Sequence, residues 1–303
     1  CTPKPPVAYR RERWTSSDGD FIDVDFVDGQ PGMPLVVLFH GLEGSSNSHY
    51  ARSLMAALRE RGWSGAVPHF RGCSGEANLM PRFYHSGDAH EIDWIVRKLH
   101  ARMPGSRGPL FVAGVSLGGN ALLRWLGESG HGAEIVAAAC AVSAPLDLAR
   151  GGEALSSGFN MLYTRMFLQT LKPKCLAKLE RYPGLFDRTA MMQARDLYAF
   201  DNVVTAPLHG YASAQDYYRR CSSRYFLGAI QVPCLLIQAH NDPFVYPHSL
   251  PQLSELGPRT EFELHQGGGH VGFIEGPPWR PRYYLECRTP AWLQHQLQSA
   301  PSG

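Results

Sequence analysis

The chain has 303 residues, 44% of them hydrophobic and 18% charged, which is enough to build a large core. Its net charge of +2 comes from interspersed acidic and basic residues, so the composition excludes a dominant basic surface for nucleic acid or an anionic membrane. Every apolar run is far shorter than the roughly 20 residues that cross a bilayer as a helix. The chain is therefore predicted to form one large domain, or one domain with an insertion.

Seven cysteines are scattered along the chain, in an odd number and without a Cys-x-x-Cys pair. This usage fits reduced thiols in a cytoplasmic protein better than a disulfide framework or a zinc site. The chain begins at Cys1 and not at Met, which we interpret as a trimmed start; a lipidated cysteine after signal cleavage is the alternative.

The first half of the chain alternates apolar strand-like runs with segments of helical periodicity. Residues 21–27 alternate apolar and polar side chains, as in a half-exposed strand, whereas residues 35–39 are all apolar, as in a strand buried on both faces. The predicted strands are 21–27, 35–39, 65–70 (with Pro68 an unusual strand residue), 111–115 and 135–142, and the predicted helices are 50–61, 88–99 and 121–126.

The alternation stops after the fifth predicted strand. Residues 147–225 show no convincing strand and are rich in Met, Tyr and Phe, so we expect a helical cap whose side chains mostly pack onto the body and partly line an apolar pocket. The predicted division is 1–146 and 226–303 for the two parts of the core and 147–225 for the cap. Strand 234–239, a short helix over 249–256, edge strand 260–264 and closing helix 283–297 complete the prediction.

This order of elements predicts an α/β fold with a mostly parallel central sheet and helices on both faces. In such sheets ligands bind beyond the carboxyl ends of the strands. The loops after Phe39, Phe70 and Val115 are expected at that edge.

The predicted strand 111–115 leads into Gly114-x-Ser116-x-Gly118 and then a helix. A turn this tight leaves no room for side chains two residues to either side of the serine, which is why glycine flanks it. The turn would expose the Ser116 hydroxyl and point the amide of Leu117 at the same place, giving a nucleophile and half of an oxyanion hole. Alone, the pattern also fits a glycine-rich connection with an incidental serine.

A serine nucleophile needs a base, and the base needs a carboxylate. Asp242 follows the strand 234–239, and His270 follows the next strand inside a glycine-rich loop, so the order serine, acid, histidine is that of a hydrolase triad. Asp242 could instead serve an ordinary turn, Asp147 is a rival acid, and His270 could be a solvated loop residue. We predict Ser116, Asp242 and His270 as the catalytic residues.

The second oxyanion donor is predicted to be the amide of Leu42, in the loop after Phe39. His40 is expected to brace this loop through hydrogen bonds. Glu43 would oppose a nearby oxyanion unless it is turned away or paired, and Arg71 is its predicted partner. His90-Glu91 lacks the second histidine of a zinc-protease motif, and no phosphate loop or dinucleotide fingerprint occurs, so no metal or organic cofactor is expected.

Five segments together resemble the YheT-type branch of the α/β-hydrolases: HGLEGSS (40–46), FRGCSG (70–75), GVSLGGN (114–120), NDPF (241–244) and GGHVGF (268–273). The resemblance implies the α/β-hydrolase fold and a serine hydrolase with Ser116 as nucleophile, Asp242 as acid and His270 as base. It suggests carboxylic-ester substrates, with some eukaryotic relatives acting on lipids and carrying an N-terminal membrane segment. Without such a segment in this sequence, a bacterial-type cytoplasmic member is expected. Asn241 departs from the family pattern, which favours a second acid there.

The predicted function is ester hydrolysis through an acyl-enzyme on Ser116, with a small-molecule ester or lipid-like substrate and no nucleic-acid partner. A thioesterase or lipid-directed lipase would use the same residues, and a non-catalytic member of the fold would only bind a ligand. Substrate and oligomeric state stay open.

Overall fold

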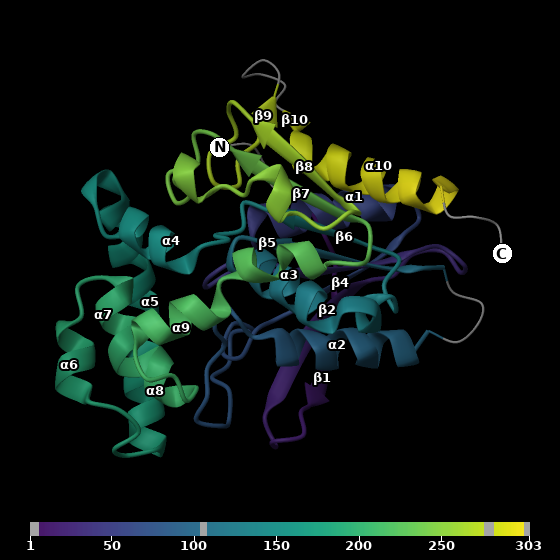
Figure 1. Cartoon of the computed structure of the whole chain (residues 1–303). Helices are drawn as coiled ribbons and strands as arrows, with labels where there is room; N and C mark the ends of the chain where they lie inside the picture. The colour runs from purple at the N-terminus through teal and green to yellow at the C-terminus, as the bar shows by residue number, and fades with distance from the viewer. Residues whose placement is uncertain (1–5, 104–107, 276–281, 300–303) are drawn as a thin grey trace.

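The computed structural model describes residues 6–103, 108–275 and 282–299 (Figure 1). Its centre is an eight-stranded sheet in the order β1-β2-β4-β3-β5-β6-β7-β8, in which β1, β2 and β4 pair antiparallel and the pairs from β4 through β3 to β8 are parallel. The strands are β1 (Arg10–Thr15), β2 (Phe21–Val27), β3 (Leu35–Phe39), β4 (Ser64–Pro68), β5 (Leu110–Val115), β6 (Ala138–Val142), β7 (Cys234–Ala239) and β8 (Thr260–His265).

Helices cover both faces of the sheet, so the core has two layers. Helices α1 (His49–Glu60) and α10 (Tyr284–Ser299) pack on one face, and α2 (Ala89–Ala101) and α3 (Leu117–Ser129) on the other (Figure 1). Alternate residues of β3 therefore enter different layers, and all five of its residues are buried. The predicted α/β fold class is confirmed.

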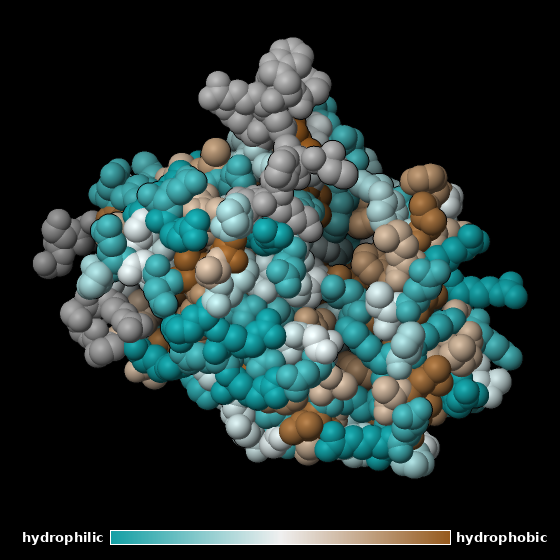
Figure 2. All heavy atoms as spheres, turned by 180° about the vertical axis from the view of Figure 1, so that it is seen from behind, coloured by the Kyte–Doolittle hydropathy of each residue, from teal (hydrophilic) through white to brown (hydrophobic). Residues whose placement is uncertain are grey.

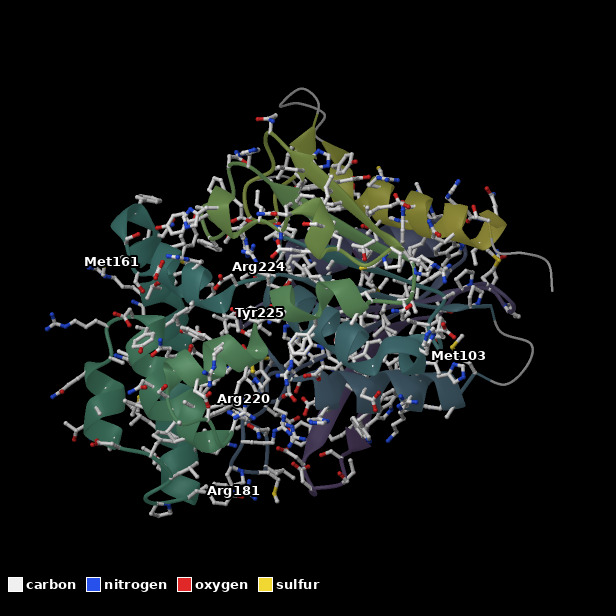
Figure 3. The ribbon with its side chains drawn as sticks, viewed as in Figure 1. Met103, Met161, Arg181, Arg220, Arg224 and Tyr225 are labelled. Carbon is white, nitrogen blue, oxygen red and sulfur yellow. The ribbon has the colours of Figure 1, made fainter. Side chains whose placement is uncertain are left out.

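Between β6 and β7 the chain forms a separate group of helices, which we call the cap (residues 147–225). All of these residues are described, and none lies in a strand. The cap has a small core of its own, and Figure 3 shows Met161 and Arg181 at the two ends of its longest helix, with Arg224 and Tyr225 where the chain returns to the body. Its helices are α4 (Leu148–Leu155), α5 (Met161–Arg181), α6 (Arg188–Gln193), α7 (Leu197–Phe200), α8 (Ala206–Leu208) and α9 (Ala214–Cys221).

The remaining elements are short. A two-stranded ribbon joins β9 (Ile274–Glu275) and β10 (Arg282–Tyr283). Short 3₁₀ helices occupy Gly130–Ala133, Gly158–Asn160, Ser223–Ala229, Pro247–Ser249 and Leu253–Glu255, and Asp201–Thr205 forms a short π-helix. None of the helices in the described ranges is both long and apolar enough to span a membrane.

Three sequence predictions need correction. Strand β6 begins at Ala138, three residues later than predicted. The predicted helix 249–256 is replaced by the end of one 3₁₀ turn (Pro247–Ser249) and a second turn (Leu253–Glu255). Strand β2 is almost wholly buried and not half-exposed. Its polar residues are buried as ion pairs, because β1 lies beside it and supplies arginines to Asp23 and Asp25. The N-terminal residue Cys1 lies outside the described residues.

We expect acid to destabilise the fold through these β2 carboxylates. Burial of Asp25 opposes ionisation, yet hydrogen bonds from Arg11, His69 and Ser46 lower its pKa below the usual range. A lowered carboxyl pKa in the folded state stabilises the protein above the unfolded pKa, near 4, and this stabilisation is lost as the pH falls further. Urea unfolding between pH 5 and pH 2.5 should show a loss of about 2 kcal/mol from this group.

The variant Asp25→Asn isolates the contribution. It should be less stable at pH 7 than the parent protein, and its stability should fall less steeply between pH 5 and pH 2.5. An identical slope in the two proteins would contradict the assignment.

Candidate active site

Ser116 lies at a sharp turn between the end of β5 and the start of α3. Its backbone is left-handed, with φ of 53°, which is uncommon for a residue with a side chain. A Cβ atom on Gly118 would lie 2.4 Å from the carbonyl oxygen of Phe39, and one on Gly114 would lie 2.6 Å from the carbonyl oxygen of Gly118. Only glycine fits at both places, so the close approach of three backbone segments fixes the position of the serine.

The structure brings Asp242 and His270 to this turn. The imidazole Nε2 of His270 lies 2.8 Å from Ser116 Oγ, and its Nδ1 lies 2.9 Å from Asp242 Oδ2. The Asp242 carboxylate is fully buried, whereas the His270 side chain is 16% exposed. A buried carboxylate on Nδ1 favours the tautomer whose Nε2 accepts the serine proton.

Local contacts hold the acid and the histidine in place. The amide of Phe244 donates to Asp242 Oδ1 (2.9 Å), and the amide of Gly269 donates to the side-chain oxygen of Asn241 (2.9 Å). The Phe244 ring lies 4.4 Å, centre to centre, from the His270 ring. Asn241, which departs from the family pattern, thus anchors the histidine loop through an oxygen that a carboxylate would also offer.

The rival acid has a different position. Asp147 precedes α4, and its carboxylate accepts the amide of Arg150 (3.2 Å) as an N-cap. Asp242, and not Asp147, is therefore the acid that lies within hydrogen-bond distance of His270.

Hydrogen bonds with His40 and Tyr50 hold the loop after β3 in place. Burial lowers the pKa of His40 to about 3, so its ring is neutral; Nδ1 donates to the carbonyl of Gly41 (2.8 Å) and Nε2 accepts the amide of Phe70 (3.0 Å). The amide of Gly41 donates to the Tyr50 hydroxyl (2.9 Å). Within the described ranges neither the Leu42 amide nor the first-turn amide of Leu117 has an acceptor. Both N–H groups are therefore free to bind an oxygen.

The predicted pairing of Glu43 with Arg71 is wrong. Arg71 is buried against Asp18, Asp20 and Glu91, at 2.6–2.9 Å. Glu43 is paired instead with Lys174 of cap helix α5, whose Nζ lies 2.7 Å from Oε2. The pairing arises because the cap folds back over the loop.

Tyr84 completes the Glu43 contacts. Its hydroxyl donates to Glu43 Oε1 (2.9 Å) and accepts the Glu43 amide (2.7 Å). Glu43 itself has φ of 54°, so the residue next to Leu42 is fixed by both the body and the cap.

A cleft of about 620 Å³ opens over Ser116 and His270 between the body and the cap. This is within the usual range for small-molecule sites, roughly 300–1,000 Å³. Figure 2 shows the surface hollowed between the two parts, with apolar atoms on the cap side. The body contributes Tyr50, Pro145, Phe244 and Val271 to the lining, and the cap contributes Leu148, Leu155, Met166, Phe167 and Leu197.

Sequence reasoning missed Lys174, Tyr84 and Asn120. The Asn120 amide donates to the carbonyls of Ser86 (2.7 Å) and Cys221 (2.9 Å), and its oxygen accepts the amide of Ser223, so it joins α3 to the end of the cap. The one signal in the sequence was for Asn120, an asparagine close behind the Gly-x-Ser-x-Gly turn. No sequence signal pointed to Lys174, because its partner Glu43 lies 131 residues away in the chain.

Comparisons with known proteins agree with this architecture. The family model for the alpha/beta hydrolase fold matches residues 34–277. The protein named "Putative esterase YheT" from Escherichia coli (strain K12) is 41% identical, over 95% of this chain and 85% of its own. "Phospholipase ABHD3" from Mus musculus is 31% identical, over 98% and 74% of the two chains.

A solved esterase structure, Pf2001 from Pyrococcus furiosus, superposes with a TM-score of 0.61 at 18% identity, covering 95% of this chain and 91% of that one. This likeness shows the fold alone. The matched family model and the identity to YheT together show that this chain belongs to the YheT-type branch of the α/β-hydrolase family.

Proposed function

We propose that the protein is a serine hydrolase that cleaves carboxylic esters through an acyl-enzyme on Ser116. The observation that carries the proposal is the chain of two hydrogen bonds from Ser116 Oγ to His270 Nε2 (2.8 Å) and from His270 Nδ1 to Asp242 Oδ2 (2.9 Å). A serine hydroxyl is a weak nucleophile until a base removes its proton, and this geometry places the base on it.

In the first step Ser116 Oγ bonds to the ester carbonyl carbon while its proton moves to His270 Nε2. The carbonyl oxygen becomes an oxyanion and accepts hydrogen bonds from the amides of Leu42 and Leu117, the latter at the positive end of α3. His270 then gives the proton to the alcohol oxygen as the C–O bond breaks, leaving the acyl-enzyme.

In the second step water replaces the alcohol. It attacks the acyl carbon as His270 Nε2 takes its proton, and the proton returns to Ser116 Oγ as the acid leaves. Asp242 stays ionised and stabilises the imidazolium in both steps.

The apolar walls of the cleft favour esters with hydrocarbon groups, and the names of two relatives refer to lipid substrates: "Phospholipase ABHD3" and, from Saccharomyces cerevisiae, "Monoacylglycerol lipase". A lipid-like ester is therefore the second candidate substrate class. We place the enzyme in the cytoplasm, since the cysteines within the described ranges are free thiols, as in a reducing compartment.

The test is turnover of p-nitrophenyl esters, an acyl-thioester and a monoglyceride, with stopped-flow recording of the first turnover. An initial burst of nitrophenol equal to the enzyme concentration is expected if the acyl-enzyme accumulates. Faster thioester or glyceride turnover would select the thioesterase or lipase alternative. No turnover of any of these would favour a member that only binds a ligand.

Lys174→Met should lower kcat about tenfold. It removes the ammonium group from Glu43 and leaves a carboxylate, 10% exposed, beside the Leu42 amide that is proposed to bind the oxyanion. That carboxylate opposes the negative charge that develops on the carbonyl oxygen, so the transition state should lose part of its stabilisation.

Lys172→Met is the matched control on the same helix. Its Nζ donates to the carbonyls of Met192 and Ala194 within the cap, so kcat should stay within about twofold of the parent. Lys174→Arg should restore most of the activity. Equal kcat in the two methionine variants would refute the role of the Glu43–Lys174 pair.

A further inference from the structure

The catalytic cleft continues into a side pocket beneath the cap. Leu42 and Leu117 line both spaces, as do Ser86 and Asp201, so the two meet beside the amides proposed to bind the oxyanion. The side pocket has a volume of about 90 Å³. At roughly 10–15 Å³ for one water-sized probe, this is room for about six to nine water-sized groups.

The walls of the side pocket are mostly apolar and come largely from the cap. Phe200, Val204 and Cys175 are at least 95% buried and belong to the core of the cap. Leu171 of α5 and Phe83 of the body pack against them. A hydrocarbon chain is the ligand that such walls accept.

Most of the polar side chains at the pocket are already bonded within the protein. Glu43 is paired with Lys174, and Asp201 accepts hydrogen bonds from Tyr218 and Thr205. Burial lowers the pKa of His85 to about 3, so that ring is neutral, and it accepts the amide of Gly87.

Both ring nitrogens of the neighbouring His209 lie within hydrogen-bond distance of backbone carbonyls, those of Thr205 (2.7 Å) and Phe83 (2.9 Å). At Glu43, Asp201 and His209 a polar ligand group would therefore compete with existing contacts, whereas an alkyl chain would not.

The position of His270 decides which half of an ester enters the side pocket. The alcohol oxygen must lie near His270 Nε2 to receive its proton, so the alcohol extends into the part of the cleft lined by His270, Phe244 and Val271. With the carbonyl oxygen on the Leu42 and Leu117 amides, the acyl group points the other way. The side pocket adjoins the cleft at Leu42 and Leu117, and Phe244, His270 and Val271 do not line it.

We propose that the side pocket is the acyl-chain site and that it selects medium-length acyl groups of about six to ten carbons. The proposal rests on the ester hydrolase function proposed above. About six carbons would fill the side pocket, and the first few after the carbonyl would lie in the cleft. Longer chains would meet Phe200, Val204 and Cys175 of the cap core.

A chain-length series of p-nitrophenyl esters from acetate to palmitate tests this site. For the parent protein, kcat/KM should rise by up to about fourfold for each added methylene that is buried, reach a maximum between hexanoate and decanoate, and then fall. A profile that is flat, or that still rises at palmitate, would overturn the size limit.

Two tryptophan variants on α5, five positions apart, separate the side pocket from the main cleft. Leu171→Trp fills the side pocket, and Met166→Trp adds the same bulk at a half-exposed cleft residue. Leu171→Trp should lower kcat/KM for octanoate at least tenfold while acetate stays within about threefold, because acetate does not reach the pocket. Met166→Trp lies in the cleft that every ester occupies, so it should change kcat/KM for acetate and octanoate by about the same factor.

Acetate esters of alcohols of increasing length provide a second series, in which only the alcohol half of the ester varies. If Leu171→Trp changed the alcohol-length profile and left the acyl-length profile intact, the assignment of the pocket to the acyl chain would be overturned. If Leu171→Trp fails to fold, Leu171→Ala enlarges the pocket and should move the optimum to longer acyl chains; an unmoved optimum would refute the proposal.

Labelling of Ser116 by a small fluorophosphonate tests the hydrolase function separately from the acyl-chain site. Loss of labelling and of all ester turnover in the parent protein would remove the hydrolase function itself. Intact labelling with an unaltered chain-length profile in Leu171→Trp would remove only the acyl site.

Discussion

Ser116→Ala is expected to lower kcat for ester hydrolysis by about 10⁴-fold or more, because the acyl-enzyme can no longer form. The substitution removes one oxygen atom and leaves the turn, the imidazole and the two candidate oxyanion amides in place. The fold should be retained, with an unfolding transition close to that of the parent. Initial rates on a short p-nitrophenyl ester, with circular dichroism as the folding check, measure both.

Ser143→Ala provides a matched control. Ser143 follows the neighbouring strand β6, has a similar φ of 50°, and its buried hydroxyl has no hydrogen-bond partner in the part of the chain that the structure describes. Its replacement should leave kcat within about threefold of the parent. If Ser116→Ala and Ser143→Ala kept the same activity, the assignment of the nucleophile would be wrong.

Gly118→Ala is expected to reduce both activity and stability strongly. The added methyl carbon would lie 2.4 Å from the carbonyl oxygen of Phe39 and 2.5 Å from that of His40, and neither backbone can move without disturbing β3 and the Leu42 loop. Overpacking of this kind costs about 1–3 kcal/mol or more. Displacement of the serine turn by about 1 Å should cost about 100-fold in kcat.

Gly132→Ala is the control for this prediction. A methyl carbon there would meet nothing closer than 3.9 Å, so stability and kcat should be close to those of the parent. Urea unfolding measures the stability of both variants, and ester kinetics measure their kcat. Parent-like stability in Gly118→Ala would show that the turn is less tightly enclosed than its contacts indicate.

The parts of the fold that could be predicted are those in which short-range pattern carries the information. The buried run 35–39 and the periodic segment 88–99 became β3 and α2 with ends shifted by at most two residues. Strand β1 was missed because its sequence, Arg-Arg-Glu-Arg-Trp-Thr, is charged. Its charges are satisfied by carboxylates on β2, which is a tertiary effect that no local pattern records.

The same distinction applies to the site. Ser116, Asp242 and His270 stand at the ends of predicted strands, so the order of elements was enough to propose that they meet. The partner of Glu43 could not be found in this way, because Lys174 lies in the middle of a cap helix with no motif around it. The acyl-chain site proposed here was equally hidden, since its walls depend on how the cap helices pack on the body.

The most direct test of the central claim is labelling of the folded protein with a fluorophosphonate, followed by peptide mapping by mass spectrometry. One adduct is expected, on Ser116; it should form much more slowly in His270→Ala and be absent when the protein is unfolded before labelling. A folded protein that forms no adduct on Ser116, or is labelled equally well without His270, would contradict the central claim.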